Sequence, residues 1–228
     1  MPYFDYWYVI LVIPAMILSM IASASVKSTY AKYAKIASRR GMTGSQIAYE
    51  ILRRAGINEV SIGRVGGQLS DHYSPKEKII RLSEGVYDGS SVASLGVAAH
   101  EAGHVLQYYG NYFPIRLRNS ILPVVNFGSS LSMPLVILGL ILGVGILVDV
   151  GIVLFAVVVS FQVLTLPVEF NASSRALKQL ESCGALNSDE LPKAKKVLNA
   201  AAMTYVASVA VSLAQLLRLI LISNNRRR

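Results

Sequence analysis

The sequence is poor in the residues that build disulfide frameworks and zinc fingers. It has one cysteine, Cys183, and three histidines among 228 residues, which excludes an internal disulfide framework and any Cys-rich zinc module. Charged residues make up only 15% of the chain, whereas hydrophobic residues reach 53%. This is the reverse of the balance in disordered proteins, and it is also unusual for an ordinary soluble domain.

Acidic residues are outnumbered by basic ones, so the formal net charge is +9. A chain that is both apolar and basic is expected of a membrane protein with basic cytoplasmic loops, or of a nucleic-acid binder with a large core. The lysines and arginines gather beside apolar blocks, and no basic stripe is interleaved with aromatic residues in the way that single-strand binding requires. The sequence therefore favours a membrane protein and predicts no nucleic-acid partner.

Four apolar blocks are candidates for membrane spans, which need about 20 largely apolar residues. The two middle blocks carry no charge, and Asp149 and Gly151 predict a tight turn between them. The last block contains Gln215 and Arg218, so it is expected either to span the membrane or to lie on a surface. The blocks are residues 7–22, 131–148, 151–168 and 200–223.

The basic residues predict the orientation of these spans. Residues 1–24 contain no lysine or arginine, which argues against a secretory signal and for an uncleaved anchor. Of the 22 basic residues, 18 lie in segments 25–120 and 169–202. Two predicted spans separate these segments, so both lie on one side, and the positive-inside rule places that side in the cytoplasm. The arginine tail 226–228 conflicts with this orientation if the fourth block crosses.

The polar segment that follows the first block is expected to hold several short elements. Glycine, proline and capping residues mark their limits. The predicted elements are a helix over residues 26–40, a helix capped by Thr43 or Ser45 that stops near Gly56, strands over 60–62 and 78–82, a turn over 71–75, and a helix over 92–109 capped by residues 88–91.

The last of these helices carries the pattern H-E-x-x-H, from His100 through Glu101 to His104. Residues four apart lie on one helix face, so both imidazoles can bind one metal ion. Two neutral nitrogens, a carboxylate and an open fourth position suit hydrolytic Zn²⁺. Glu101 is then expected to be the general base that accepts a proton from the attacking water.

A third metal ligand has to come from outside this pattern. The candidates are His72, Asp149 and the other carboxylates, and the predicted topology places Asp149 across the membrane from the motif. Glu169 follows the third block on the motif's side, where a helix is expected to begin after Pro167. Its carboxylate can bind zinc, or it can be a simple acidic charge that the helix N-terminus favours.

The loop before the second strand contains His72 and Tyr73. Either residue can supply a donor for the oxyanion of a tetrahedral intermediate. The alternative for His72 is a turn histidine that bonds the local backbone. The strand over residues 78–82 is expected to pair by its edge with an extended substrate.

A set of segments along nearly the whole chain carries a family resemblance. They are Leu69–Tyr73, Arg81–Glu84, Val97–His104, Pro123–Phe127 and Leu166–Ala176. With these segments the chain resembles the bacterial membrane-bound neutral zinc metallopeptidases, the YugP-like family. It is more distantly similar to the HtpX-like and CAAX-prenyl endopeptidases, which place two spans between the H-E-x-x-H helix and a glutamate ligand in an E-x-x-A-D pattern.

The resemblance implies a gluzincin-like zinc peptidase with Glu169 as the third ligand. Ala172 matches the E-x-x-A-D pattern, whereas Ser173 stands where the distant relatives have aspartate. The implied reaction is hydrolysis of membrane-associated or misfolded proteins at the cytoplasmic face of the bacterial cytoplasmic membrane. Membrane lipid and polypeptide substrates are the expected partners, and the oligomeric state is left open. The alternative is a non-catalytic, zinc-stabilised membrane scaffold or adaptor, against which the intact Glu101 argues.

The predicted fold is mainly α-helical and membrane-bound. It has three to four transmembrane helices and a small cytoplasmic α+β region of zincin-like type. The expected organisation is an N-terminal anchor (residues 1–24), a cytoplasmic catalytic region (25–120), a transmembrane hairpin (121–168), a cytoplasmic segment with the third ligand (169–202), a transmembrane or surface helix (203–223) and a basic tail (224–228).

Overall fold

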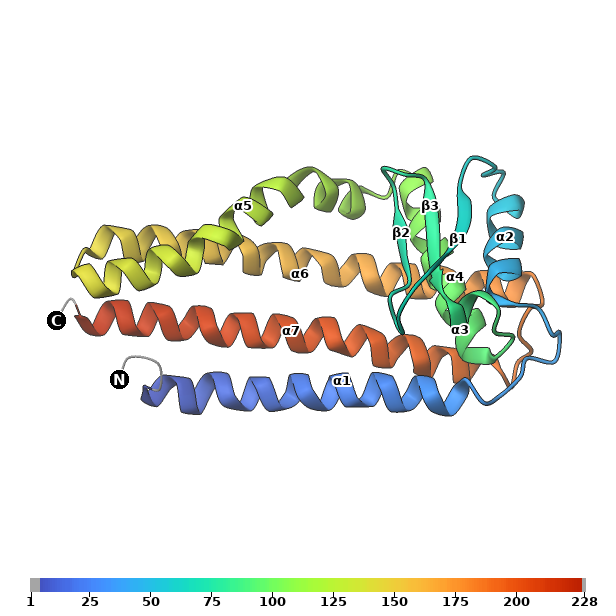
Figure 1. The fold of residues 1–228 in the computed structure, drawn as a ribbon, viewed down its shortest axis with the longest axis horizontal. Helices are drawn as coiled ribbons and strands as arrows, with labels where there is room; N and C mark the ends of the chain where they lie inside the picture. Colours follow the sequence, from blue (N-terminus) through green and yellow to red (C-terminus); the bar gives the residue numbers. More distant parts are fainter. Residues whose placement is uncertain (1–4, 227–228) are drawn as a thin grey trace. The chain divides into compact units, whose positions relative to one another are not determined.

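The computed structural model describes residues 5–226, with Arg226 described by its backbone only, so the remainder of the predicted arginine tail lies outside the described residues. Along the chain the elements are a π-helical turn (Tyr8–Val12), α1 (Ile13–Tyr33), α2 (Gly44–Arg54), β1 (Ser61–Val65), β2 (His72–Ser74), β3 (Ile79–Ser83), α3 (Glu84–Tyr87), α4 (Val92–Tyr109), α5 (Phe113–Leu142), α6 (Gly145–Ser182) and α7 (Leu191–Arg226) (Figure 1).

The chain forms two compact units. The first, called the apolar unit below, comprises the described residues up to Ser23, Arg116–Pro167 and the residues from Met203 onward. The second, called the polar unit, comprises Ala24–Ile115 and Val168–Ala202.

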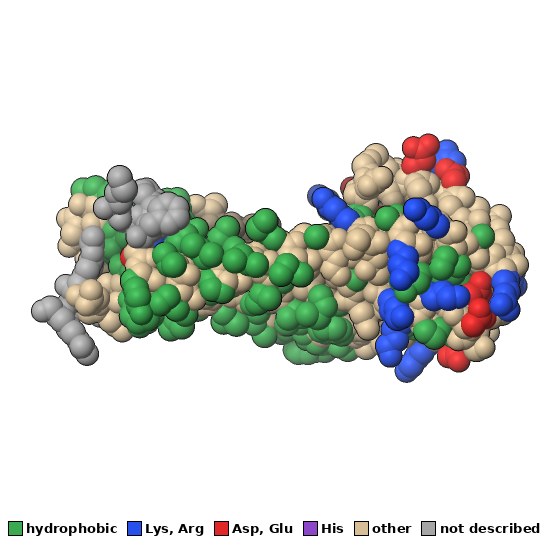
Figure 2. All heavy atoms as spheres, turned by 90° about the horizontal axis from the view of Figure 1, so that it is seen from below, with side chains coloured by type: hydrophobic (Ala, Val, Ile, Leu, Met, Phe, Trp, Pro, Cys, Tyr) green, Lys and Arg blue, Asp and Glu red, His purple; other side chains and the backbone are tan. Residues whose placement is uncertain are grey.

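Within the described residues, four helical runs are long and apolar enough to cross a membrane, and they include the fourth block. Large side chains such as Ile17 in α1, Phe127 in α5 and Val153 in α6 are exposed. Figure 2 shows such hydrophobic side chains over the helices of the apolar unit, whereas Lys, Arg, Asp and Glu gather on the polar unit. The runs are Tyr8–Tyr33, Phe113–Leu142, Gly145–Ser182 and Leu191–Asn225. The predicted mainly α membrane fold with a small α+β region is therefore confirmed.

The turn between the two middle spans was predicted at the wrong residues. α5 ends at Leu142 and α6 begins at Gly145, while Asp149 and Gly151 lie inside α6. Gly143 makes the turn with φ of 69°, a left-handed conformation that glycine adopts without steric cost. Gly151 instead allows close packing, because a Cβ there would lie 2.7 Å from the carbonyl oxygen of Ser132.

The charge inside the fourth block is paired. The Nε and Nη2 atoms of Arg218 donate to Oδ2 of Asp5 at 2.9 and 2.7 Å, and its guanidinium lies 5.0 Å from the ring centroid of Tyr8. A planar guanidinium can satisfy a carboxylate and face an aromatic ring at once. This pairing makes an arginine compatible with an otherwise apolar helix.

The polar unit contains a three-stranded sheet in the order β1-β3-β2. β1 runs parallel to β3, and β2 runs antiparallel to it, with Tyr73 opposite Ile80. Residues 71–75 were expected to form a turn, but three of them form β2, so that prediction was wrong. β3 is central and paired on both sides, which also overturns the expectation that the strand over residues 78–82 offers its edge to a substrate.

The core of the polar unit lies between the sheet and the helices that surround it. Its largest fully buried side chains come from several elements, including Ile47 and Ile51 of α2, Leu82 of β3, Leu95 of α4 and Leu180 of α6. The side chain of Thr43 accepts from the backbone N–H of Gln46 and forms a capping box at the start of α2, which stabilises the helix terminus. The first helix ends at Tyr33, earlier than the predicted Arg40.

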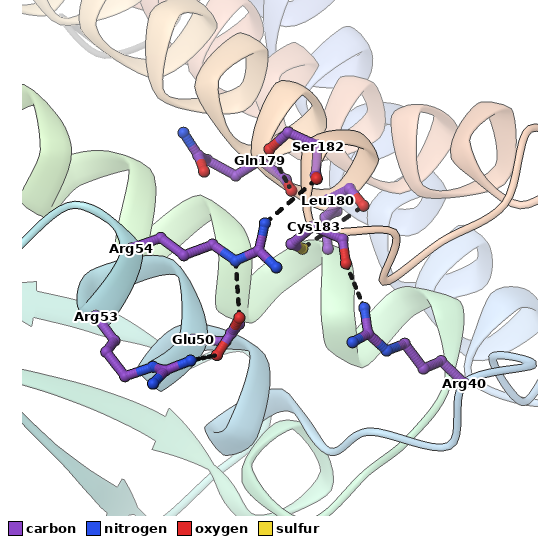
Figure 3. A network of polar contacts seen from close by, with 8 residues as sticks. All are labelled: Arg40, Glu50, Arg53, Arg54, Gln179, Leu180, Ser182 and Cys183. Carbon is purple, nitrogen blue, oxygen red and sulfur yellow. Dashed lines mark hydrogen bonds and ion pairs between the residues drawn. The ribbon is translucent and has the colours of Figure 1, made fainter.

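Two arginines hold the C-terminal end of α6 (Figure 3). Nη1 of Arg40 donates to the carbonyl oxygen of Cys183, and Nη1 of Arg54 donates to that of Ser182 at 3.3 Å. Glu50 holds Arg54 in place through Nε at 2.7 Å. Carbonyls at a helix C-terminus lack intrahelical donors and attract cations, so these contacts attach α6 to the rest of the polar unit.

Candidate metal centre

The H-E-x-x-H segment lies in the middle of α4, whose first turn is fixed by Ser91. The Oγ of Ser91 accepts from the backbone N–H of Ser94 at 3.1 Å, and the Oγ of Ser94 donates to the carbonyl oxygen of Gly85 at 3.0 Å. The predicted helix over residues 92–109 is thereby confirmed at both ends. His100 and His104 lie on one face of it, with ring centroids 4.7 Å apart.

Glu169 lies beside these histidines, although it is far away in the sequence. α6 continues through Pro167, so Glu169 is an interior residue of that helix rather than the first one. The expected helix start after Pro167 was therefore wrong, and with it the alternative of a simple charge at a helix N-terminus. α4 approaches α6 at Gly103 and Ala172, one residue before His104 and three residues after Glu169.

The three side chains converge on one point. Oε2 of Glu169 lies 3.3 Å from Nε2 of His100 and 3.6 Å from Nε2 of His104. One ligand atom from each residue lies within 4.8 Å of the others. Two imidazole nitrogens and one carboxylate oxygen at this spacing form a donor set that suits zinc.

The hydrogen bonds around the cluster also fit a metal ion. Oε2 of Glu169 is buried and has no hydrogen-bond donor among the described residues, which is costly for a carboxylate unless a cation lies nearby. Nδ1 of His100 lies 3.1 Å from Oγ of Ser173, and Nδ1 of His104 lies 3.0 Å from Oε1 of Gln107. These contacts occupy the Nδ1 atoms of both histidines and leave both Nε2 atoms directed at Oε2 of Glu169.

Glu101 follows the first histidine and is buried, with 7% of its surface exposed. Burial raises the pKa of Glu101, and the positive charge that His104 and His100 can carry opposes this rise. A carboxyl group whose pKa lies above its ordinary range can both accept and return a proton near neutral pH. The environment of Glu101 is thus suited to general acid–base chemistry.

The pKa of His104 is raised as well. Burial opposes its charged form, but the carboxylates of Glu169 and Glu101 outweigh that effect. Negative charge therefore concentrates around the histidine, which is the environment in which a divalent cation binds favourably.

The structure leaves two of the sequence-derived candidates outside this cluster. His72 lies at the start of β2 with an exposed side chain, and its Nδ1 is 2.8 Å from the carbonyl oxygen of Ser70. This is the local backbone contact considered as its alternative role. Asp149 lies in α6 within the apolar unit, where its Oδ1 is 3.5 Å from Oγ of Ser223.

Tyr73 lies on β2, an element in contact with α4. Its ring packs edge-on against that of Tyr108, with centroids 6.3 Å apart. Its hydroxyl is buried without a hydrogen-bond partner among the described residues. Burial raises the pKa of Tyr73, so the phenol stays protonated and can donate.

Sequence reasoning missed Gln107 and Asn171 as neighbours of the ligands. Gln107 lies three residues after His104, and Asn171 lies two residues after Glu169. The i, i+3 spacing of a buried polar residue on the motif helix was a signal for Gln107. Nothing local distinguishes Asn171, because its contact crosses from α6 to α4.

Comparison with known proteins agrees with this geometry. A family model described as "Putative neutral zinc metallopeptidase" matches residues 8–224. The chain is 45% identical over 220 residues to the "Putative membrane protease YugP" of Bacillus subtilis (strain 168). The aligned region covers 96% of this chain and 98% of that protein. No solved structure matches. The family resemblance seen in the sequence is confirmed.

Proposed function

We propose, on the premise that the chain belongs to the family of neutral zinc metallopeptidases, that it is a zinc-dependent endopeptidase of membrane-associated or misfolded proteins. His100, His104 and Glu169 hold the zinc ion, and Glu101 is the general base. One observation carries the proposal: ligand atoms of two helices converge within 4.8 Å around a carboxylate oxygen that is buried without a hydrogen-bond donor among the described residues, next to a buried glutamate.

Each residue has a distinct task in hydrolysis. Zinc, when bound, supplies Lewis acidity that polarises a peptide carbonyl and makes water a stronger nucleophile near neutral pH. Glu101 accepts the proton of the attacking water and passes it to the leaving amine. The burial that raises the pKa of Glu101 favours acceptance of the proton from water.

Tyr73 is a better candidate than His72 for the oxyanion donor. Its hydroxyl is buried and lacks a partner among the described residues, whereas the exposed ring of His72 is held by the carbonyl of Ser70. Loss of one such donor lowers kcat by about 100- to 1,000-fold in hydrolases. Tyr73→Phe is therefore expected to lower kcat at unchanged zinc content, and His72→Ala to have little effect.

An extended substrate can pair only with an edge strand. Since β3 is central, we assign this role to β2, which lies against α4. Backbone hydrogen bonds to β2 would hold a polypeptide by its main chain and demand little of its side chains. Such binding suits an enzyme that degrades misfolded chains.

The active site is assigned to the cytoplasmic face of the bacterial cytoplasmic membrane. Of the 22 lysines and arginines, 18 lie in residues 25–120 and 169–202, and such residues gather on the cytoplasmic side of spans. A reporter fused after Gly110 is expected to report the cytoplasm. Reporter activity only outside the cell would overturn this orientation without affecting the metal site.

The decisive experiment uses Glu101→Gln and Glu169→Ala in the purified full-length protein. Glu101→Gln is expected to keep one zinc ion and to lose peptide hydrolysis by at least about 100-fold. Glu169→Ala is expected to lose the zinc ion. Equal cleavage of casein by wild type and Glu101→Gln would exclude Glu101 as the general base. A wild-type protein that binds zinc but cleaves no substrate would favour the scaffold alternative. Proteins trapped by Glu101→Gln in cells would identify the substrates.

A further inference from the structure

Gln107 is the most deeply buried polar side chain near the cluster. It is fully buried in the described structure and uses both ends of its amide. Oε1 lies 3.0 Å from Nδ1 of His104. Nε2 donates to the carbonyl oxygen of Val168 at 2.7 Å and to Oδ1 of Asn171 at 3.0 Å.

The chemistry of these partners fixes the direction of every bond. A backbone carbonyl can only accept, so the Gln107 amide must present its NH₂ group to Val168. Arg175 fixes Asn171 in the same way, because its Nε can only donate and lies 2.8 Å from Oδ1 of Asn171. Both acceptors thus receive the NH₂ group, and Oε1 of Gln107 is left facing His104.

An amide oxygen can only accept, so Nδ1 of His104 must carry the proton. The neutral ring then has its lone pair on Nε2, which is the atom directed at Glu169. His100 is held differently, because its neighbour Ser173 has a hydroxyl that can donate or accept. The tautomer of His104 is set by the fold, and that of His100 is left to adapt.

We propose that Gln107 is a positioning residue that holds His104 ready for the metal and ties it to the third ligand, with Asn171 and Arg175 fixing its orientation. This proposal rests on the proposed zinc site. The carbonyl that Gln107 binds belongs to Val168, the residue immediately before Glu169. The side chain of Gln107 therefore couples the ring of His104 to the backbone immediately before Glu169.

The test measures zinc affinity in the full-length protein, after removal of metal, by competition with a chelating dye. Gln107→Met keeps the length of the side chain and removes its hydrogen bonds. We expect a loss of about 10- to 100-fold in zinc affinity, the usual effect of removing a partner of a metal-bound histidine. The visible spectrum of the Co²⁺-substituted protein is expected to change as well, because the second imidazole is no longer held.

Two substitutions at Asn171 refine the test. Asn171→Asp keeps an acceptor for both Gln107 and Arg175 and is expected to retain the affinity and the Co²⁺ spectrum of the wild type. Asn171→Leu removes that acceptor but leaves Val168 in place, so a smaller loss than that of Gln107→Met is expected. These variants also keep the proposal testable if Gln107→Met does not fold.

Ser94→Ala is the matched control, because Ser94 is also a buried polar residue of α4 and lies at the first turn. It is expected to lower the melting temperature of the metal-free protein without changing zinc affinity. If Gln107→Met behaves like Ser94→Ala, with wild-type affinity and spectrum, Gln107 is only structural and the proposal is overturned.

The outcomes also separate this proposal from the proposed function. Zinc binding that weakens in Gln107→Met, in a protein that cleaves no peptide, would remove the peptidase and leave the role of Gln107 intact. If Gln107→Met cleaves peptides as the wild type does and binds zinc with unchanged affinity, the proposed function stands and the role of Gln107 is excluded. A wild-type protein that binds no zinc would overturn both.

Discussion

A Cβ atom on Gly103 would lie 2.6 Å from the carbonyl oxygen of Ala172. No side chain fits at that distance, so glycine at this position, between Glu101 and His104, lets the backbones of α4 and α6 come into contact. The contact lies one residue before His104 and three residues after Glu169. The spacing of the metal ligands therefore depends on the lack of a side chain at Gly103.

Gly103→Ala is expected to force these helices apart. Overpacking of this kind costs about 1–3 kcal/mol, and the displacement of Glu169 from His104 should weaken zinc binding. Gly96→Ala on the same helix is the control, because its Cβ would lie 3.6 Å from that of Ala194, an ordinary contact. The melting temperature and the zinc affinity should both fall in Gly103→Ala, and neither should fall in Gly96→Ala. Unchanged zinc affinity in Gly103→Ala would show that the ligand spacing tolerates the shift.

Ser173 offers a test at the other histidine. Its Oγ lies 3.1 Å from Nδ1 of His100, so Ser173→Ala should lower zinc affinity, by less than Gln107→Met because a hydroxyl does not fix the tautomer. Ser173→Asp places a carboxylate at this position, where it accepts more strongly and raises the basicity of the ligand. Ser173 is buried and also lines a groove between α6 and α7. Titration with zinc should rank Ser173→Asp at or above wild type, and a rank below Ser173→Ala would contradict this reading.

Arg40 is expected to stabilise the polar unit through the C-terminus of α6. Arg40→Met removes the donor to the carbonyl of Cys183, which leaves that carbonyl without its cation. We expect the melting temperature to fall by about 2–4 °C, the usual effect of roughly 1 kcal/mol in a protein of this size. Arg53→Met is the control, because Arg53 has Glu50 as its ion-pair partner and is largely exposed. Equal melting temperatures for both variants would exclude the capping role of Arg40.

Asp71 makes stability depend on pH in a defined direction. Burial raises the pKa of Asp71, although hydrogen bonds from the backbone and hydroxyl of Ser83 oppose the rise. The folded state then binds a proton more readily than the unfolded chain, so this group adds stability at low pH that is lost as pH rises. The loss lies between the ordinary aspartate pKa of about 3.9 and the raised folded value.

The variant Asp71→Asn isolates this effect, because asparagine does not titrate and its oxygen still accepts from Ser83. The unfolding free energy of metal-free wild type, relative to Asp71→Asn, should fall with rising pH across that window and then stay level. Melting curves of both proteins over a pH series measure the difference. A difference that grows as pH rises would contradict the raised pKa.

Local signals in the sequence were sufficient for several elements. Residues 88–91 marked the start of α4, where Ser91 is the cap, and of the two expected capping residues Thr43 and Ser45, Thr43 caps α2. Caps of this kind act within one helical turn, so they can be read without knowledge of the fold. The apolar blocks were equally readable, since a candidate span is recognised from the length and composition of one continuous segment.

Elements that depend on neighbours could not be read in this way. β2 has only three residues and exists through its pairing with β3, so its sequence resembled a turn. Pro167 predicted a helix start, yet α6 continues through it. Prolines are tolerated inside long apolar helices where neighbouring groups satisfy the backbone carbonyl that the proline leaves free. The turn at Gly143 was assigned to Asp149 because a charge between apolar blocks is the stronger local signal.

The sequence by itself determined the pair of histidines, since four residues of helix place His100 and His104 on one face wherever that helix lies. It also determined Glu101 beside them and the apolar lengths that suit a membrane. Tertiary structure decided the rest of the centre. Glu169 and Ser173 meet the histidines across the contact of α4 with α6, and Gln107 of α4 bonds Val168 and Asn171 across the same contact. The separation of the two helices there depends on the absence of a side chain at Gly103, which no periodicity within either helix predicts.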